Sequence, residues 1–190
     1  PASWDLETSD INDISFGVVN TYNPVYNLYS AKYENIANPG NPEGFLSTDV
    51  DTNNILVMHN INKAYQAVTS SNFSVSSNKY YKLSFDYKLI ATDSVTELLN
   101  IYVIDENNNV LYADENIAQT NFTWQKYTIY VSTNVYSNDL KLVVKLGTKD
   151  SLVKGIAYLD NVTLFEDEAM TKESYEALSE DANVLDFQEG

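Results

Sequence analysis

The chain has 190 residues, of which 44% are hydrophobic and 13% aromatic, and it contains no cysteine. This length and composition fit one folded domain with a sizeable core, and they exclude a disulfide framework and a disordered chain. The formal net charge of -16 argues against nucleic acid and anionic membrane surfaces as partners, because both are negatively charged. No run approaches the roughly 18 apolar residues that a membrane-spanning helix needs, so no membrane insertion is expected.

The first third of the chain shows few regular elements. The segment from Tyr22 to Phe45 is interrupted by prolines and glycine, and its tyrosines fall at helical spacing, so a short helix and a tyrosine-rich loop both remain open. Strands are predicted at Gly44–Val50 and Asn54–His59, separated by a polar turn, and a further interrupted strand at Gln66–Val75.

From Lys79 onward, apolar and polar residues alternate with the period of half-buried strands. In the first of these runs, Tyr81, Leu83, Phe85, Tyr87 and Leu89 share one face. A hairpin is predicted over Leu98–Ala113, and three further strands follow, at Trp124–Ser132, Leu140–Leu146 and Ile156–Phe165. Many short strands with frequent turns and no βαβ rhythm predict an all-β, antiparallel sandwich.

The acidic residues are concentrated after residue 166. Residues 166–190 hold nine carboxylates against Lys172 alone. The pattern predicts a helix over Glu166–Ala182, followed by a strand or linker at Asn183–Phe187. We therefore expect a β-sandwich domain in residues 1–165 and an acidic helical linker to a further domain in residues 166–190.

Asp160 is the residue that most needs an explanation. It interrupts the apolar run GIAYLDNVTLF of the last predicted long strand. A carboxylate in such a run is costly to bury unless a cation or hydrogen-bond donors meet it. A bound cation is one explanation, and hydrogen bonds from backbone amides of an adjacent loop are the other.

Five segments in order resemble the second half of carbohydrate-binding-module jelly rolls with the galactose-binding-like fold: YYKLSFDYKL, LNIYVID, WQKYTIYV, LVVKLGT and AYLDNVTLF. The resemblance covers roughly residues 54–165. It implies a jelly-roll β-sandwich in which Asp160, with an acidic residue of the first strand that maps to Glu7, holds a structural calcium ion. The family's frequent Asn-Pro-Phe-Glu opening is not intact here. Calcium also suits the chemistry, because Ca²⁺ takes about 6–8 oxygen ligands from carboxylates and carbonyls.

Saccharide binding requires aromatic faces beside amide or carboxylate groups. The richest such cluster in the sequence lies between residues 22 and 33 and comprises Tyr22, Tyr26, Asn27, Tyr29 and Tyr33. These tyrosines are candidate ligand-binding residues, with the alternative that several of them cover an edge of the sandwich. Trp124 is a second possible platform, but its position at the start of a regular strand favours core packing.

Catalysis has little support in the sequence. His59 is the only histidine, no nucleophile elbow or phosphate-binding loop is present, and no carboxylate pair stands out. We therefore predict a non-enzyme.

The function that the resemblance implies is glycan or polysaccharide binding by a module of a multidomain bacterial protein, secreted or on the cell surface. The alternative is a structural or adhesive spacer on the same fold, with no sugar site. Exposed aromatic and amide groups on a concave sheet face would favour the binding module, whereas a face closed by aliphatic side chains would favour the spacer. Two close carboxylates in a cleft would instead favour a hydrolase or lyase.

Overall fold

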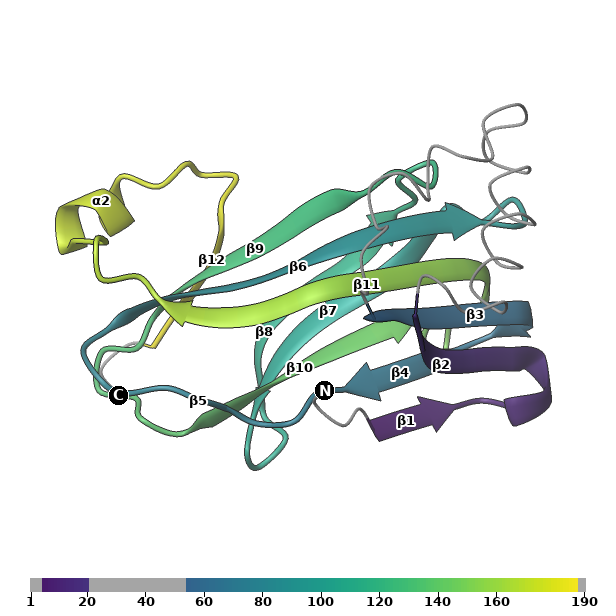
Figure 1. The fold of residues 1–190 in the computed structure, drawn as a ribbon, viewed down its shortest axis with the longest axis horizontal. Helices are drawn as coiled ribbons and strands as arrows, with labels where there is room; N and C mark the ends of the chain where they lie inside the picture. Colours follow the sequence, from purple (N-terminus) through teal and green to yellow (C-terminus); the bar gives the residue numbers. More distant parts are fainter. Residues whose placement is uncertain (1–4, 21–53, 188–190) are drawn as a thin grey trace.

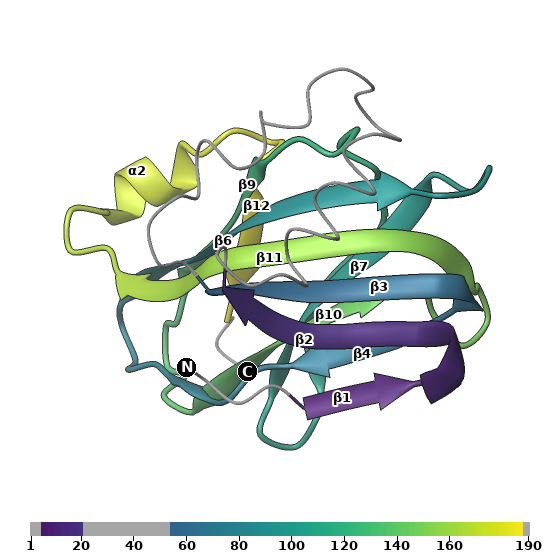
Figure 2. The same cartoon turned by 45° about the vertical axis from the view of Figure 1, so that its right-hand side comes forward.

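The structure is a computed structural model that describes residues 5–20 and 54–187, and these residues form a sandwich of two β-sheets (Figure 1). In the view turned by 45°, strands of sheet B lie in front of strands of sheet A (Figure 2). The predicted all-β sandwich is therefore confirmed. No helix in the described residues is long and apolar enough to cross a membrane.

The strands are arranged as follows. Sheet A has the order β1 (Asp5–Thr8), β4 (Gln66–Thr69), β10 (Asp139–Leu146), β7 (Glu97–Asp105) and β8 (Val110–Ala118), and β5 (Phe73–Ser74) pairs with β10. Sheet B has the order β12 (Asn183–Asp186), β9 (Gln125–Ser132), β6 (Tyr80–Ala91), β11 (Val153–Glu166), β3 (Asn54–Ala64) and β2 (Ile14–Asn20). A 3-10 helix, η1 (Ile11–Asp13), joins β1 and β2, and a short α-helix, α2 (Lys172–Glu176), precedes β12.

Alternation along the strands determines which side chains enter the core between the sheets. On β6 the inward residues are those that the pattern predicted: Tyr81, Leu83, Phe85, Tyr87 and Leu89. All of them except Tyr87 are at most 8% exposed. Burying each large apolar side chain stabilises the fold by about 1.5–3 kcal/mol, so this strand anchors sheet B to sheet A.

The chain crosses repeatedly between the two sheets. It passes from β6 in sheet B to β7 and β8 in sheet A, then to β9 in sheet B, β10 in sheet A and β11 in sheet B. This connectivity is that of a jelly roll. It places β11, which carries Asp160, in the middle of sheet B between β6 and β3.

The C-terminal segment differs from the prediction. The helix covers only Lys172–Glu176, and the chain then returns to sheet B, where β12 pairs in parallel with β9. Leu185 of β12 is 6% exposed and belongs to the main core. The sandwich therefore extends past the predicted boundary at residue 165, because burial of Leu185 ties the segment to the sheet edge.

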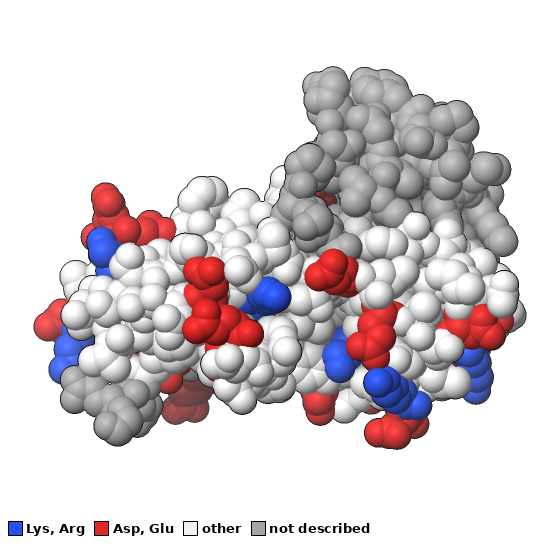
Figure 3. All heavy atoms as spheres, turned by 90° about the horizontal axis from the view of Figure 1, so that it is seen from below, with Lys and Arg blue, Asp and Glu red and all other residues white. Residues whose placement is uncertain are grey.

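The other predicted strands are confirmed where the structure describes them, and β3 and β8 are longer than predicted. The segments Tyr22–Phe45 and Gly44–Val50 lie outside the described residues. On the face seen from below in Figure 3, carboxylates and lysines are interspersed and form no large patch of one sign.

Candidate functional site

The outer face of sheet B, which points away from sheet A, carries apolar, aromatic and charged side chains. Its residues alternate with those of the core, so on β6 they are Tyr80, Lys82, Ser84, Asp86, Lys88 and Ile90. Along the length of the strands, this face is apolar at one end, polar in the middle and bordered by a pocket at the other end.

One end of the outer face is apolar and closed. Four aliphatic residues there are at most 4% exposed: Ile55, Val57, Ile90 and Ile156. Tyr158, 0% exposed, packs against the ring of Phe122 with a centroid distance of 5.3 Å. These residues form a second small core, so this half of the face offers no open platform.

The loop before β9 supplies the aromatic part of this second core. The backbone N–H groups of Thr120 and Phe122 donate to the carbonyl of Leu89, at 3.0 and 3.2 Å. Phe122 has a positive φ of 59°, an uncommon conformation for a bulky residue. The ammonium of Lys88, itself 2% exposed, lies 4.4 Å from the centroid of the Phe122 ring. Cation–π attraction of this kind helps the buried charge to be tolerated.

The middle of the outer face is polar. Asp160 and Asp86 are opposite each other on β11 and β6. The Asn161 side-chain amide donates to Asp86 Oδ2 at 2.9 Å, and Lys126 Nζ lies 3.5 Å from Asp86 Oδ1. Asp160 Oδ1 accepts a bond from the backbone N–H of Asn161 at 2.7 Å. This donor is the next residue of β11 and not part of an adjacent loop, so the bond is not the one that the second explanation predicted.

At the other end of the sheet α2 lies beyond the tip of β11 (Figure 1), and a pocket of about 450 Å³ lies beside the helix. We call it the tyrosine pocket, and its lining includes Tyr80, Ser132, Asn134, Lys172, Tyr175, Glu180 and Asp186. The rings of Tyr80 and Tyr175 have centroids 5.1 Å apart and are tilted by 37°. The pocket thus combines two aromatic rings with amide, hydroxyl and carboxylate groups.

The pocket forms because the chain returns to sheet B after α2 and adds β12 beside β9. Asn134, with a positive φ of 44°, directs its side-chain amide to Asp186 Oδ1 at 2.8 Å and to the Phe187 carbonyl. The Phe187 ring stacks on Tyr136 at a centroid distance of 4.0 Å. At the start of α2, Thr171 and Ser174 form a reciprocal capping box, which fixes the approach of the helix.

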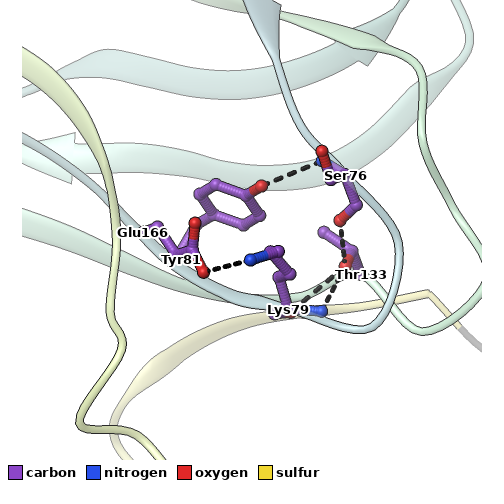
Figure 4. Close-up of polar contacts among 5 residues, drawn as sticks. All are labelled: Ser76, Lys79, Tyr81, Thr133 and Glu166. Carbon is purple, nitrogen blue, oxygen red and sulfur yellow. Dashed lines mark hydrogen bonds and ion pairs between the residues drawn. The ribbon is translucent and has the colours of Figure 1, made fainter.

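A polar cluster of five residues joins the ends of strands that also carry pocket residues (Figure 4). Thr133 donates its hydroxyl to the Ser76 carbonyl at 2.7 Å and accepts from the backbone N–H of Lys79 at 3.0 Å. The Tyr81 hydroxyl accepts from the backbone N–H of Ser76 at 2.9 Å. The Lys79 ammonium pairs with Glu166 at the end of β11. These contacts hold the ends of β6, β9 and β11 together, so the neighbouring residues Tyr80 and Ser132 are positioned by rigid elements.

Burial, with smaller contributions from the charge of Asp186 and from Tyr80, raises the pKa of Tyr175 to about 12. Its hydroxyl therefore stays protonated at an alkaline pH at which an exposed tyrosine has begun to ionise. It donates to the Leu185 carbonyl at 3.4 Å, which orients the ring toward Tyr80.

A row of four side chains adjoins the pocket on the outer face. Strand register places Phe165, Lys82, Tyr130 and Val184 side by side across β11, β6, β9 and β12. Phe165 is 65% exposed, which is unusual for a phenylalanine. Lys82 Nζ lies 5.7 Å from the Tyr130 ring centroid and 3.4 Å from Asp167. The row extends the aromatic surface of the pocket over the sheet.

The predicted ligand-binding residues Tyr22, Tyr26, Asn27, Tyr29 and Tyr33 lie outside the described residues, so their role stays a prediction. Trp124 is partly buried beside the second core, with its ring centroid 6.4 Å from that of Tyr158. His59 lies inside β3 and is 6% exposed, rather than at a strand end.

The structure does not bring the two predicted calcium ligands together. Glu7 is on β1 of sheet A, whereas Asp160 is on β11 of sheet B. Glu7 Oε1 accepts from the Tyr65 hydroxyl at 2.7 Å and lies 3.0 Å from Lys149 Nζ. The hydrogen bonds from Tyr65 and Lys149 hold the pKa of Glu7 below its usual value. The two carboxylates do not fit one shared ion, and within residues 5–20 and 54–187 no group of three or more His, Cys, Asp or Glu could hold a metal.

Structural calcium therefore stays a prediction, and melting curves in calcium and in EDTA test it. An ion bound only by the folded chain stabilises it by about 2.7 kcal/mol at a hundredfold excess over Kd, which corresponds to a shift of several degrees. If Asp160 is a ligand, Asp160→Asn removes the shift. The carboxylate of Glu7 already has two partners, Tyr65 and Lys149, so Glu7→Gln should retain the calcium-dependent shift in melting temperature. Coincident wild-type curves with and without EDTA would contradict the metal.

The tyrosine pocket could not be found from the sequence, because two of its tyrosines come from segments about 95 residues apart. Tyr80 begins a strand, whereas Tyr175 lies in a segment that composition assigns to a linker. The one available signal was the apolar NVLDF run after the helix, which suggested a further strand.

No protein-family model matches the chain, and no curated protein matches its sequence. Among solved structures, an exo-β-agarase shares 9% identity at a TM-score of 0.51, over 91% of this chain and 24% of the agarase chain. The enzymatically active domain of tailspike protein 4 of bacteriophage CBA120 shares 16% identity at a TM-score of 0.51, over 86% of this chain and 19% of the tailspike chain. The carbohydrate-binding module TmCBM61, in complex with β-1,4-galactotriose, shares 11% identity at a TM-score of 0.49, over 86% of this chain and 88% of the module. At these identities the likeness concerns the fold alone, and this chain spans only about a fifth to a quarter of the tailspike and agarase chains.

Proposed function

We propose that this chain is a non-catalytic module that binds a saccharide in the tyrosine pocket. The observation that carries the proposal is the paired rings of Tyr80 and Tyr175, 5.1 Å apart, over a hollow of about 450 Å³. The proposal includes a location outside the cell or on its surface, where polysaccharide ligands are found, within a protein of several domains.

The pocket has the chemistry that a saccharide requires. Aromatic rings accept the C–H-rich face of a sugar ring, while amides, hydroxyls and carboxylates bond to its hydroxyl groups. Asn134, Ser132 and Asp186 provide those groups at the wall of the pocket. Its volume falls within the range of about 300–1,000 Å³ that is typical of small-ligand sites. The exposed ring of Phe165 nearby offers further surface for a longer chain.

A glycan array followed by calorimetric titration of the best ligand tests the proposal. We expect Tyr175→Ala to weaken binding about tenfold, because loss of one stacked ring costs on the order of 1.4 kcal/mol. Tyr80→Ala should have a similar effect. Circular dichroism and melting curves establish that each variant is folded.

The matched control is Tyr102→Ala, because Tyr102 lies on sheet A, away from the pocket, where its hydroxyl bonds to Glu115 at 2.6 Å. It should leave the affinity unchanged. Loss of binding in Tyr26→Ala or Tyr29→Ala, with Tyr175→Ala unaffected, would place the site in the tyrosine cluster found in the sequence and refute the pocket assignment.

A structural spacer is the second candidate, and one observation favours it. The apolar half of the outer face is closed by Ile55, Val57, Ile90 and Ile156, as expected for a sheet face that binds nothing. If the folded chain bound no plant, host or microbial glycan on the array, the result would support the structural spacer over the binding module.

A further inference from the structure

The charge around the tyrosine pocket is strongly negative. Residues 166–187 carry eight carboxylates against one lysine, which gives a net charge of -7 in the segment that forms one side of the pocket. The whole chain has a net charge of -16. Such a concentration of one sign attracts ligands of the opposite sign and repels those of the same sign.

One lysine, Lys172, lines the pocket, and its ion-pair partner Glu176 lines it too. Lys79 pairs with Glu166, Lys82 with Asp167, and Lys172 with Glu176 at 3.9 Å. By contrast, Asp186 and Glu180, which both line the pocket, have no lysine partner in the part of the chain that the structure describes. The pocket therefore presents two carboxylates whose charge is not balanced by a cation of the fold.

Aromatic rings add to the preference for a positive group. The negative faces of Tyr80 and Tyr175 attract a cation placed against them. One side of the pocket thus carries the ring pair, and Asp186 lies beside Tyr175 closely enough for its charge to affect the tyrosine. A cationic group in the hollow gains from the rings and from the carboxylates together.

We infer that the saccharide taken by the tyrosine pocket carries a free amino group, as in oligomers of glucosamine, and that uronate or sulfated saccharides are rejected. The ammonium lies against Asp186 and Glu180, and the sugar ring lies against the tyrosine pair. This inference rests on the proposed function and specifies the ligand class of the same site.

The experiment compares two ligands of the same backbone, one with free amino groups and one with uncharged N-acetyl groups. The glucosamine tetramer and its N-acetylated counterpart, chitotetraose, share linkage and length, and only the first is cationic at pH 6. Titration calorimetry with the full chain should give an affinity about three- to tenfold higher for the glucosamine tetramer, the range expected for one or two partly exposed ion pairs. The preference should shrink at high salt, because exposed charges are then screened.

Two isosteric variants separate charge from shape. Asp186→Asn retains an acceptor for Asn134, and Glu180→Gln retains the size of the side chain; in the double variant the two tetramers should bind equally. Glu106→Gln, which removes one charge from an exposed turn, is the matched control and should leave the preference intact.

Each outcome is decisive. Equal or tighter binding of chitotetraose by the wild-type chain overturns the amino-sugar inference while the proposed function stands. Binding of an oligouronate as tight as that of the glucosamine tetramer also overturns it. Absence of binding to every saccharide tested overturns both the amino-sugar inference and the proposed function. A charge preference that survives in the double variant refutes the role of Asp186 and Glu180.

Discussion

Replacing Asn60 by Asp is expected to lower the free energy of unfolding by about 3–5 kcal/mol. Asn60 is 0% exposed and lies at the end of the sandwich where β3, β10 and β11 meet. Its side-chain amide is within hydrogen-bonding distance of three carbonyl oxygens, those of Ala64 at 3.0 Å, Val153 at 3.1 Å and Leu146 at 3.2 Å. Its Oδ1 accepts from Gln66 Nε2 at 2.9 Å.

The physical reason is the loss of the Asn60 Nδ2 donor, which all three carbonyl oxygens share. A carboxylate in the same position would face three carbonyl oxygens with a negative charge and no water to solvate it. Asn60→Ala introduces no charge; it removes the contacts to the carbonyls and to Gln66, which we expect to cost about 1–3 kcal/mol in total. We therefore expect the order of stability to be wild type, then Asn60→Ala, then Asn60→Asp.

Urea unfolding followed by tryptophan fluorescence measures both variants. Asn72→Asp makes the same chemical change at an exposed position between β4 and β5, and it should stay within about 0.5 kcal/mol of the wild type. If Asn60→Asp unfolded at the urea concentration of the wild type, the polar cluster would contribute nothing to stability, contrary to this account.

Alkaline pH should destabilise the fold steeply, beginning near the ordinary tyrosine pKa of about 10. Burial, reinforced by its hydrogen bond to Asp114 and by Tyr112, raises the pKa of Tyr127 far above that value. Its hydroxyl donates to Asp114 Oδ2 at 2.5 Å and lies 2.7 Å from the Tyr112 hydroxyl. Burial likewise raises the pKa of Tyr112, Tyr87 and Tyr175, in the last case to about 12.

The direction of this pH dependence follows from the coupling between protonation and folding. Because the folded-state pKa is raised, the stabilisation is fully present below pH 10 and is lost as pH rises toward the folded-state value. Above pH 10, each tyrosine that ionises only on unfolding lowers the free energy of unfolding by about 1.4 kcal/mol per pH unit. Two such tyrosines would remove about 3 kcal/mol between pH 10 and pH 11.

Urea unfolding at pH 8, 10 and 11 measures this loss. Tyr127→Phe is the diagnostic variant: it should be less stable than the wild type at pH 8, because Asp114 and Tyr112 lose a partner, yet its stability should fall less steeply above pH 10. A wild-type unfolding free energy at pH 11 equal to that at pH 8 would show that these hydroxyls do not remain protonated in the folded chain.

The sequence by itself determined which side chains share a face within each strand. The alternation of Tyr81, Leu83 and Phe85 with polar residues is a local property of extended backbone, and it correctly identified the inner face of β6. The turn after β7 was equally readable, because Asp105 accepts bonds from the backbone N–H groups of Asn107 and Asn109 close to it in the chain. From such local signals the all-β sandwich could be predicted.

Only the tertiary structure decided which strands became neighbours and which surfaces were left open. The alternation of Lys88 with core residues predicts an outward side chain, yet Lys88 is buried, with its ammonium 4.4 Å from the centroid of the Phe122 ring. Glu7 and Asp160 were expected to meet, but β1 joined sheet A and β11 joined sheet B. The pairing of β12 with β9, which builds the tyrosine pocket, links residues more than fifty positions apart. Such pairings depend on the burial of side chains such as Leu185 against a distant strand, and no local pattern in the chain encodes that partner.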